Sequence, residues 1–102
     1  MLGSDPDLLR SVVQEKLGDC HSALGDQDSA QSAYREVLAY LEAYAKDVSG
    51  LGAVEAERRQ YDLASALEKT GKMQYELGQR ESACVSLSRA ATIVEGDVAY
   101  SA

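Results

Sequence analysis

The amino-acid sequence predicts an all-α protein made of two tandem antiparallel helical hairpins, with four helices in all. Three observations support this prediction. The composition is rich in Ala, Leu, Glu and Gln and includes a single proline, Pro6, a balance that favours helices. Apolar residues recur every three or four positions along four segments, which is the spacing of one helical face. The chain also repeats part of itself at an offset of 53 residues, as from Gly25 to Gly78.

The internal repeat is clearest where residues 15–30 align with residues 68–83. The seven identical pairs among these sixteen positions are Glu15/Glu68, Lys16/Lys69, Gly18/Gly71, Leu24/Leu77, Gly25/Gly78, Ser29/Ser82 and Ala30/Ala83. A repeat of this kind indicates that one structural unit is written twice. We therefore expect a single domain over residues 1–102, with a first hairpin at about 7–47 and a second at about 53–95.

The first helix is expected to begin at Asp5-Pro6-Asp7, where an Asp N-cap and a proline in the first turn favour initiation. Gly25 should end it and let the chain reverse, and Gly78 should do the same in the second hairpin. The residues of this helix that we expect to face the core are Leu9, Val13, Leu17, Cys20 and Leu24. The four expected helices span about 7–24, 28–47, 53–77 and 81–95.

The other three helices carry similar apolar stripes. In the second helix the inward residues should be Ala30, Ala33, Tyr34, Val37, Leu38, Leu41 and Tyr44. In the third they should be Leu63, Ala66, Leu67, Thr70, Met73 and Leu77. In the fourth they should be Ala83, Leu87, Ala90, Ala91 and Val94. We expect this last helix to close near Gly96, and the Ser49–Gly52 segment to be a flexible break between the hairpins.

The charge balance and the cysteines narrow the class of protein. The net charge is −7 and no basic stripe is present, which argues against a nucleic acid or an anionic membrane as partner. No segment has the roughly 20 apolar residues of a transmembrane helix, and the N-terminus lacks the basic and apolar parts of a signal peptide. Cys20 and Cys84 have no zinc or redox spacing, so a reduced cytoplasmic protein is expected.

No motif in the sequence predicts catalysis, a metal site or a cofactor. Cys20 and His21 are adjacent on a helix and point about 100° apart, so they are expected to be a small core residue and a packing residue. The acidic residues Asp19, Asp26 and Asp28 lack the spacing of a calcium loop. We expect a protein that is not an enzyme and that binds neither metal nor cofactor.

Nine positions of the repeat follow a recognisable order. They are Leu17, Gly18, Gly25, Ala30 and Tyr34 in the first copy, and Gly71, Gly78, Ala83 and Leu87 in the second. A Leu-Gly step followed by Ala-x3-aromatic resembles the tetratricopeptide repeat signature. The resemblance implies that Gly18 and Ala30 face each other across the hairpin and that Tyr34 fills the wedge to the next helix. The fold would then be a fragment of an α-solenoid.

The chain also departs from the tetratricopeptide pattern. It has no Trp, and His21 and Gln74 replace the usual Tyr. Its period of 53 exceeds the usual period of about 34, and the extra residues correspond to roughly two and a half helical turns in each flanking helix. In this respect it resembles the long-helix repeats that form tandem arrays in large bacterial signalling proteins.

The resemblance implies a non-catalytic module that binds a peptide or partner helix on its concave face. The positions implied for this groove are Glu15, Asp19, Ser22, Glu68, Lys72 and Tyr75. Three acids and one lysine suit a segment with Lys or Arg whose stem stacks on Tyr75. The alternative is that these are solvated helix residues with i,i+4 pairs such as Glu68–Lys72.

Two other functions stay open at the level of sequence. The chain could be a structural oligomerisation or spacer element, or the repeat region of an enzyme whose catalytic part lies elsewhere. Two repeats are fewer than the three or so that stability usually needs. The apolar residues Ile93, Val94, Val98 and Tyr100 exceed what one core can bury. We therefore expect a neighbour, either further repeats or a second copy of the chain.

Overall fold

The chain folds into four α-helices, and every regular element in the described part is helical. A computed structural model describes the backbone over residues 6–47 and 50–101 and the side chains over residues 7–47 and 50–95. The helices are α1 (Pro6–Ala23), α2 (Gln27–Lys46), α3 (Ala53–Glu76) and α4 (Arg80–Ser101). This confirms the predicted all-α class. Within the described residues, no helix is long and apolar enough to cross a membrane.

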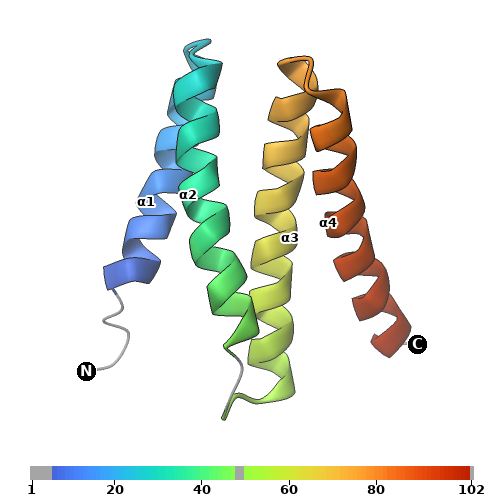
Figure 1. The fold of residues 1–102 in the computed structure, drawn as a ribbon. Coiled ribbons are helices and arrows are strands. Elements are labelled where there is room, and N and C mark those ends of the chain that lie inside the picture. Colours follow the sequence, from blue (N-terminus) through green and yellow to red (C-terminus); the bar gives the residue numbers. More distant parts are fainter. Residues whose placement is uncertain (1–5, 48–49, 102) are drawn as a thin grey trace.

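The helices form two antiparallel hairpins that stand side by side (Figure 1). Within the described residues, α1 packs on α2, α2 on α3 and α3 on α4, with no backbone contact between any other pair of helices. As a result α1 and α4 lie at the two ends of the row (Figure 1). The molecule is a slab only 17 Å across in its thinnest direction.

The two hairpin turns have the same construction. Gly25 and Gly78 adopt positive φ angles of 83° and 84°, a conformation that costs glycine little. In the first turn the Asp26 N–H donates to the His21 carbonyl, and in the second the Gln79 N–H donates to the Gln74 carbonyl. Hydrogen bonds of this reach close the last helical turn and are typical of a helix that ends at a glycine. Both turns are where the glycines predicted them.

The connection between the hairpins is fastened by one arginine. Arg59 in α3 donates hydrogen bonds to the carbonyl oxygens of Tyr44 and Asp47, at 2.9 and 2.7 Å. Its guanidinium also lies 3.8 Å from the centre of the Tyr44 ring, within the range of a cation–π contact. The end of α2 is thereby tied to the first turns of α3, which fixes the angle between the hairpins.

The core lies between α2, α3 and α4. Its main cluster is made of Val37, Leu41, Ala45, Leu63, Ala64, Ala66, Leu67 and Ala90. A smaller cluster nearer the hairpin turns joins Ala30, Tyr34 and Met73, with Leu77 packed against it. The predicted inward stripe of α3 is therefore confirmed. Ile93, which we expected to be in excess of the core, also packs against the main cluster.

Glycines of the repeat bring the two helices of each hairpin together. A Cβ added at Gly18 would lie 2.3 Å from Tyr34 Cε1, so the Tyr34 ring rests directly on the glycine. A Cβ added at Gly71 would lie 2.7 Å from Leu87 Cγ. The glycine therefore contacts the residue at the aromatic position in each copy. Tyr34 also reaches Met73 of the next hairpin, in agreement with its predicted place in the wedge.

The predicted core stripe of α1 was wrong. Leu9, Val13, Leu17 and Leu24 are 65%, 50%, 42% and 79% exposed, and Cys20 is exposed as well. The periodicity correctly identifies one apolar face, but α1 is an end helix and meets only α2 in the described chain. A helix with one neighbour leaves such a face uncovered.

Two details of α4 also differ from the predictions. The helix continues through Ser101, past the expected stop near Gly96, because a single helical glycine costs only about 1 kcal/mol and no proline follows. Its inward stripe is only partly correct: Ala83 and Ala90 are buried, whereas Leu87 and Val94 are each 40% exposed. The side chains of Val98 and Tyr100 lie outside the described residues.

Candidate functional site

An open cleft lies between α1 and α3, over part of α2. It encloses about 330 Å³. Its lining residues are Asp19, Ser22 and Ala23 from α1, Tyr34 from α2, and Lys69, Lys72, Met73 and Glu76 from α3. The floor is formed by the buried residues Tyr34 and Met73, and the walls are polar. A cleft with an apolar floor and charged walls can hold side chains of a bound segment.

Lys69 joins the two walls of the cleft. Its Nζ donates to Glu15 Oε2 at 2.6 Å and to Asp19 Oδ2 at 3.2 Å. Because α1 and α3 share no backbone contact in the described chain, this side-chain bridge links two helices that are otherwise joined through α2. The three groups remain about one-third exposed, so the bridge lies at the mouth of the cleft.

Asp19 is also hydrogen-bonded from below by Tyr34, whose hydroxyl donates to Asp19 Oδ1. Burial raises the pKa of Asp19, but the hydrogen bonds from Tyr34 and Lys69 outweigh it and lower the pKa overall. Burial and the bonded Asp19 carboxylate together raise the pKa of Tyr34. Burial alone would lower the pKa of Lys69, yet its bonds to Glu15 and Asp19 raise it. Near neutral pH Asp19 is therefore a carboxylate and Lys69 a cation.

The structure places the six predicted groove residues in three groups. Asp19, Ser22 and Lys72 line the cleft, whereas Glu15 lies beside it through Lys69. Glu68 and Tyr75 are exposed on α3, outside the cleft lining.

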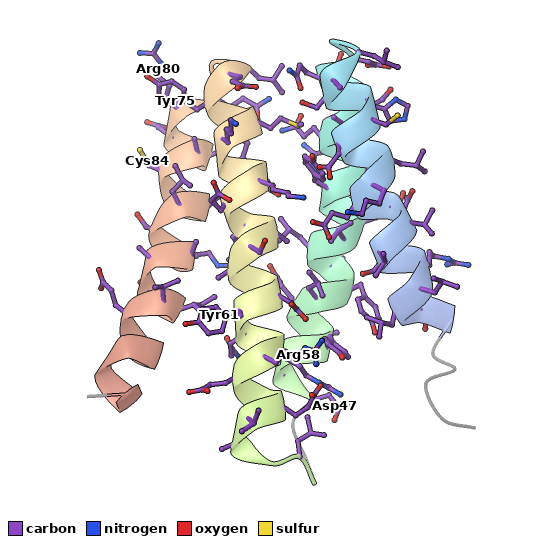
Figure 2. The ribbon with its side chains drawn as sticks, turned by 180° about the vertical axis from the view of Figure 1, so that it is seen from behind. Asp47, Arg58, Tyr61, Tyr75, Arg80 and Cys84 are labelled. Atoms are coloured by element: carbon purple, nitrogen blue, oxygen red, sulfur yellow. The ribbon has the colours of Figure 1, made fainter. Side chains whose placement is uncertain are left out.

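Tyr75 and Arg80 lie together at the turn end of the second hairpin (Figure 2), with the guanidinium 5.4 Å from the ring centre. In the described chain no salt bridge joins Glu68 to Lys72, so the expected i,i+4 pair does not form.

Sequence reasoning missed the residue that organises the cleft. Lys69 is part of the repeated Glu-Lys step at 15–16 and 68–69, so the signal was present. The groove positions carried over from the resemblance did not include it. Met73 was assigned only to the core, yet it also forms part of the floor.

The cysteines and acids do not form a chemical centre in the described chain. Cys20 and Cys84 are both exposed, which corrects the prediction that Cys20 is a small core residue. Cys84 projects from the outer side of α4 (Figure 2). Among the described residues, no three His, Cys, Asp or Glu side chains come together in a way that could hold a metal ion.

Comparison with known families gives one match. The tetratricopeptide repeat family matches residues 13–40, which span most of α1, the Gly25 turn and the first part of α2. No curated protein and no solved structure shows significant similarity to the chain. The match supports a tetratricopeptide repeat in the first hairpin, where Gly18, Ala30 and Tyr34 lie.

Proposed function

We propose, starting from the tetratricopeptide match, that this chain is a non-catalytic protein–protein interaction module that binds a peptide or a partner helix in the α1–α3 cleft. Tetratricopeptide repeats generally mediate contacts between proteins. The observation that carries the proposal is the cleft itself, lined by the first helix of each hairpin and floored by Tyr34 and Met73. Stacked hairpins present such first helices on one shared face.

The cleft favours an extended segment with alternating apolar and polar side chains. Apolar side chains can rest on Met73 and Tyr34, while the polar walls bond the backbone or polar groups of the segment. A basic segment remains our proposal, because the net charge is −7 and Glu76 lines the cleft. Lys69 offsets only one of Glu15 and Asp19, and Lys72 offsets Glu76 in the cleft lining. The attraction therefore rests mainly on the overall negative charge.

We further propose that the second hairpin is a long-helix repeat of the same kind, at a period of 53. In support, Gly71 contacts Leu87 as Gly18 contacts Tyr34, and the two turns are built alike. A cytoplasmic location and a place in a larger scaffold or signalling assembly belong to the same proposal.

Peptide selection can test the cleft directly. A displayed library of random linear peptides is selected on the wild-type protein, and the affinities of the recovered peptides are measured by fluorescence anisotropy. Ser22→Arg puts a long cation into the cleft and should weaken these peptides at least about tenfold. Lys72→Glu should change which peptide charges are preferred.

Ser88→Arg is the matched control, because Ser88 is exposed on α4 and outside the cleft. It should leave the affinities unchanged. The proposal fails if the recovered peptides bind Ser22→Arg as tightly as the wild type, or if Ser88→Arg weakens them equally.

A further inference from the structure

The outer faces of the two end helices are apolar. On α1 the exposed face includes Val13, Leu17 and Cys20, and on α4 it includes Leu87 and Val94. Neither face is covered by a further helix in the described chain, although Leu87 lies against Gly71 within its own hairpin. Exposed apolar faces on a small protein are typical of interaction sites.

Val13, Leu17 and Cys20 each have a buried counterpart in α3. Positions 53 apart occupy equivalent places in the two hairpins, because Gly18 contacts residue 34 and Gly71 contacts residue 87. The counterparts of Val13, Leu17 and Cys20 are Ala66, Thr70 and Met73, which are 6%, 3% and 3% exposed. Ala66 and Met73 belong to the clusters that α3 shares with α2. The outer face of α1 is therefore the equivalent of the face of α3 that α2 covers.

The outer face of α4 is likewise the equivalent of the face of α2 that covers α3. Leu87 and Val94 correspond to Tyr34 and Leu41, each 6% exposed. The side-chain sizes on the two outer faces also compensate for each other. Leu87 and Val94 are smaller than their counterparts on α2, whereas Val13 and Leu17 are larger than Ala66 and Thr70 on α3. A junction between the two outer faces would thus have nearly the same side-chain volume as the α2–α3 interface. Apolar substitutions that conserve volume are the ones that packing tolerates best.

The charged residues at the two ends include one complementary pair. The bridge from Lys69 to Glu15 joins the first helices of the two hairpins. Its equivalents under the same offset are Lys16 on α1 and Glu68 on α3. Both are exposed, and within the described chain neither forms a salt bridge.

We propose that α4 of one copy packs against α1 of a second copy, as α2 packs against α3, with Lys16 of one copy paired to Glu68 of the other. The two surfaces differ, so the association is head-to-tail and does not close at a dimer. Two pairs oppose it: the bridge between Arg89 and Glu42 has Glu95 and Glu36 as its equivalents, and the bridge between Lys69 and Asp19 has Lys16 and Lys72. The inference does not depend on what binds in the cleft.

The first measurement is the mass of the wild-type chain against concentration. It is made by light scattering and analytical ultracentrifugation in reducing buffer, which excludes disulfides through the exposed cysteines. The weight-average mass should rise from the 10.9 kDa monomer without a plateau at twice that value. A mass that stays monomeric up to about millimolar concentration, near the −4 kcal/mol limit of measurable association, overturns the proposal, as does a dimer plateau.

Val13→Glu tests the apolar face. Val13 is half-exposed, so the variant should keep its helical circular dichroism while the association weakens at least about tenfold. Val85→Glu is the matched control. Val85 is 61% exposed on α4, and its counterpart Ser32 is exposed on α2, so Val85 lies outside the proposed junction and its variant should associate like the wild type. Equal effects of the two variants would overturn the proposal.

Charge reversal supplies a test that leaves the core untouched. Glu68→Lys puts like charges at the junction and should weaken self-association about fivefold, more at low salt. Lys16→Glu should weaken it less, because it also removes the repulsion from Lys72. An equimolar mixture of the two variants offers an opposite-charge pair at every mixed junction and should recover the wild-type mass. Glu36→Arg should tighten the association, because it places an arginine opposite Glu95. If the mixture associates no better than the separate variants, the head-to-tail arrangement is wrong.

Discussion

Gly18→Ala is expected to destabilise the protein, although alanine is the better helix former. The added Cβ would lie 2.3 Å from Tyr34 Cε1 and 2.6 Å from Cδ1. The ring has little room to retreat, because it is buried and its hydroxyl is bonded to Asp19. Overpacking of this kind costs roughly 1–3 kcal/mol, while replacing a helical glycine by alanine gains about 0.5–1 kcal/mol. The expected net loss is about 1 kcal/mol.

Gly71→Ala is the matched comparison in the second hairpin. There the added Cβ would meet Leu87 Cγ at 2.7 Å and Cδ2 at 2.9 Å. Leu87 is flexible and 40% exposed, so it can turn outward at small cost. The gain in helix propensity then decides the outcome, and we expect the variant to be neutral or slightly stabilised. A Tyr34→Leu background should likewise remove most of the penalty at Gly18.

Urea unfolding followed by circular dichroism measures these differences, at a protein concentration low enough to keep the chain monomeric. A loss of 1 kcal/mol corresponds to a fall in Tm of about 4–8 °C for a domain of this size. The reasoning is refuted if Gly18→Ala is as stable as the wild type. It is also refuted if the loss is equally large when residue 34 is leucine, because the ring would then not be the cause.

Three further outcomes follow from individual charged residues. The lowered pKa of Asp19 stabilises the fold above the unfolded pKa of about 4, so the free energy of unfolding should decrease as the pH drops below that value. Thermal melts at a series of pH values should show a smaller decrease in Tm for Asp19→Asn than for the wild type. Outside the cleft, partial burial raises the pKa of Asp62, opposed by Arg58. Asp62 is exposed, so solvent screens the effect, and Asp62→Asn should raise Tm only slightly at neutral pH and lose this advantage below about pH 4. A lower Tm at neutral pH would contradict this. Lys69→Met leaves Glu15 and Asp19 without their cation and should cost about 1 kcal/mol in urea unfolding, a loss that should shrink in high salt if it is electrostatic.

The fold could be predicted closely because its signals are local. The glycines at 25 and 78 fixed the turns, and the 3.6-residue period located every helix to within one residue except at the end of α4. Periodicity identifies an apolar face but not the element that covers it. Leu9 and Leu24 were therefore predicted to be in the core, and they are exposed because α1 is an end helix.

The cleft was harder to predict than the fold. Asp19, Ser22 and Lys72 follow from their places on the first helices and do line the cleft. The bridging role of Lys69 depends on the distance between α1 and α3, which no local pattern contains. For the same reason, sequence alone could not show that two of the predicted acids are already paired with that lysine.

The strictly sequential packing of the helices has a consequence for how the chain folds. In the described part each helix has backbone contacts only with its neighbours along the sequence, so most contacts close loops of a single hairpin length. Helical proteins with such short-range contacts fold in microseconds to milliseconds, because little loop entropy is lost before a contact forms. During synthesis, the α1–α2 hairpin could close while α4 is still inside the ribosome, and α3 would then add to a surface already formed.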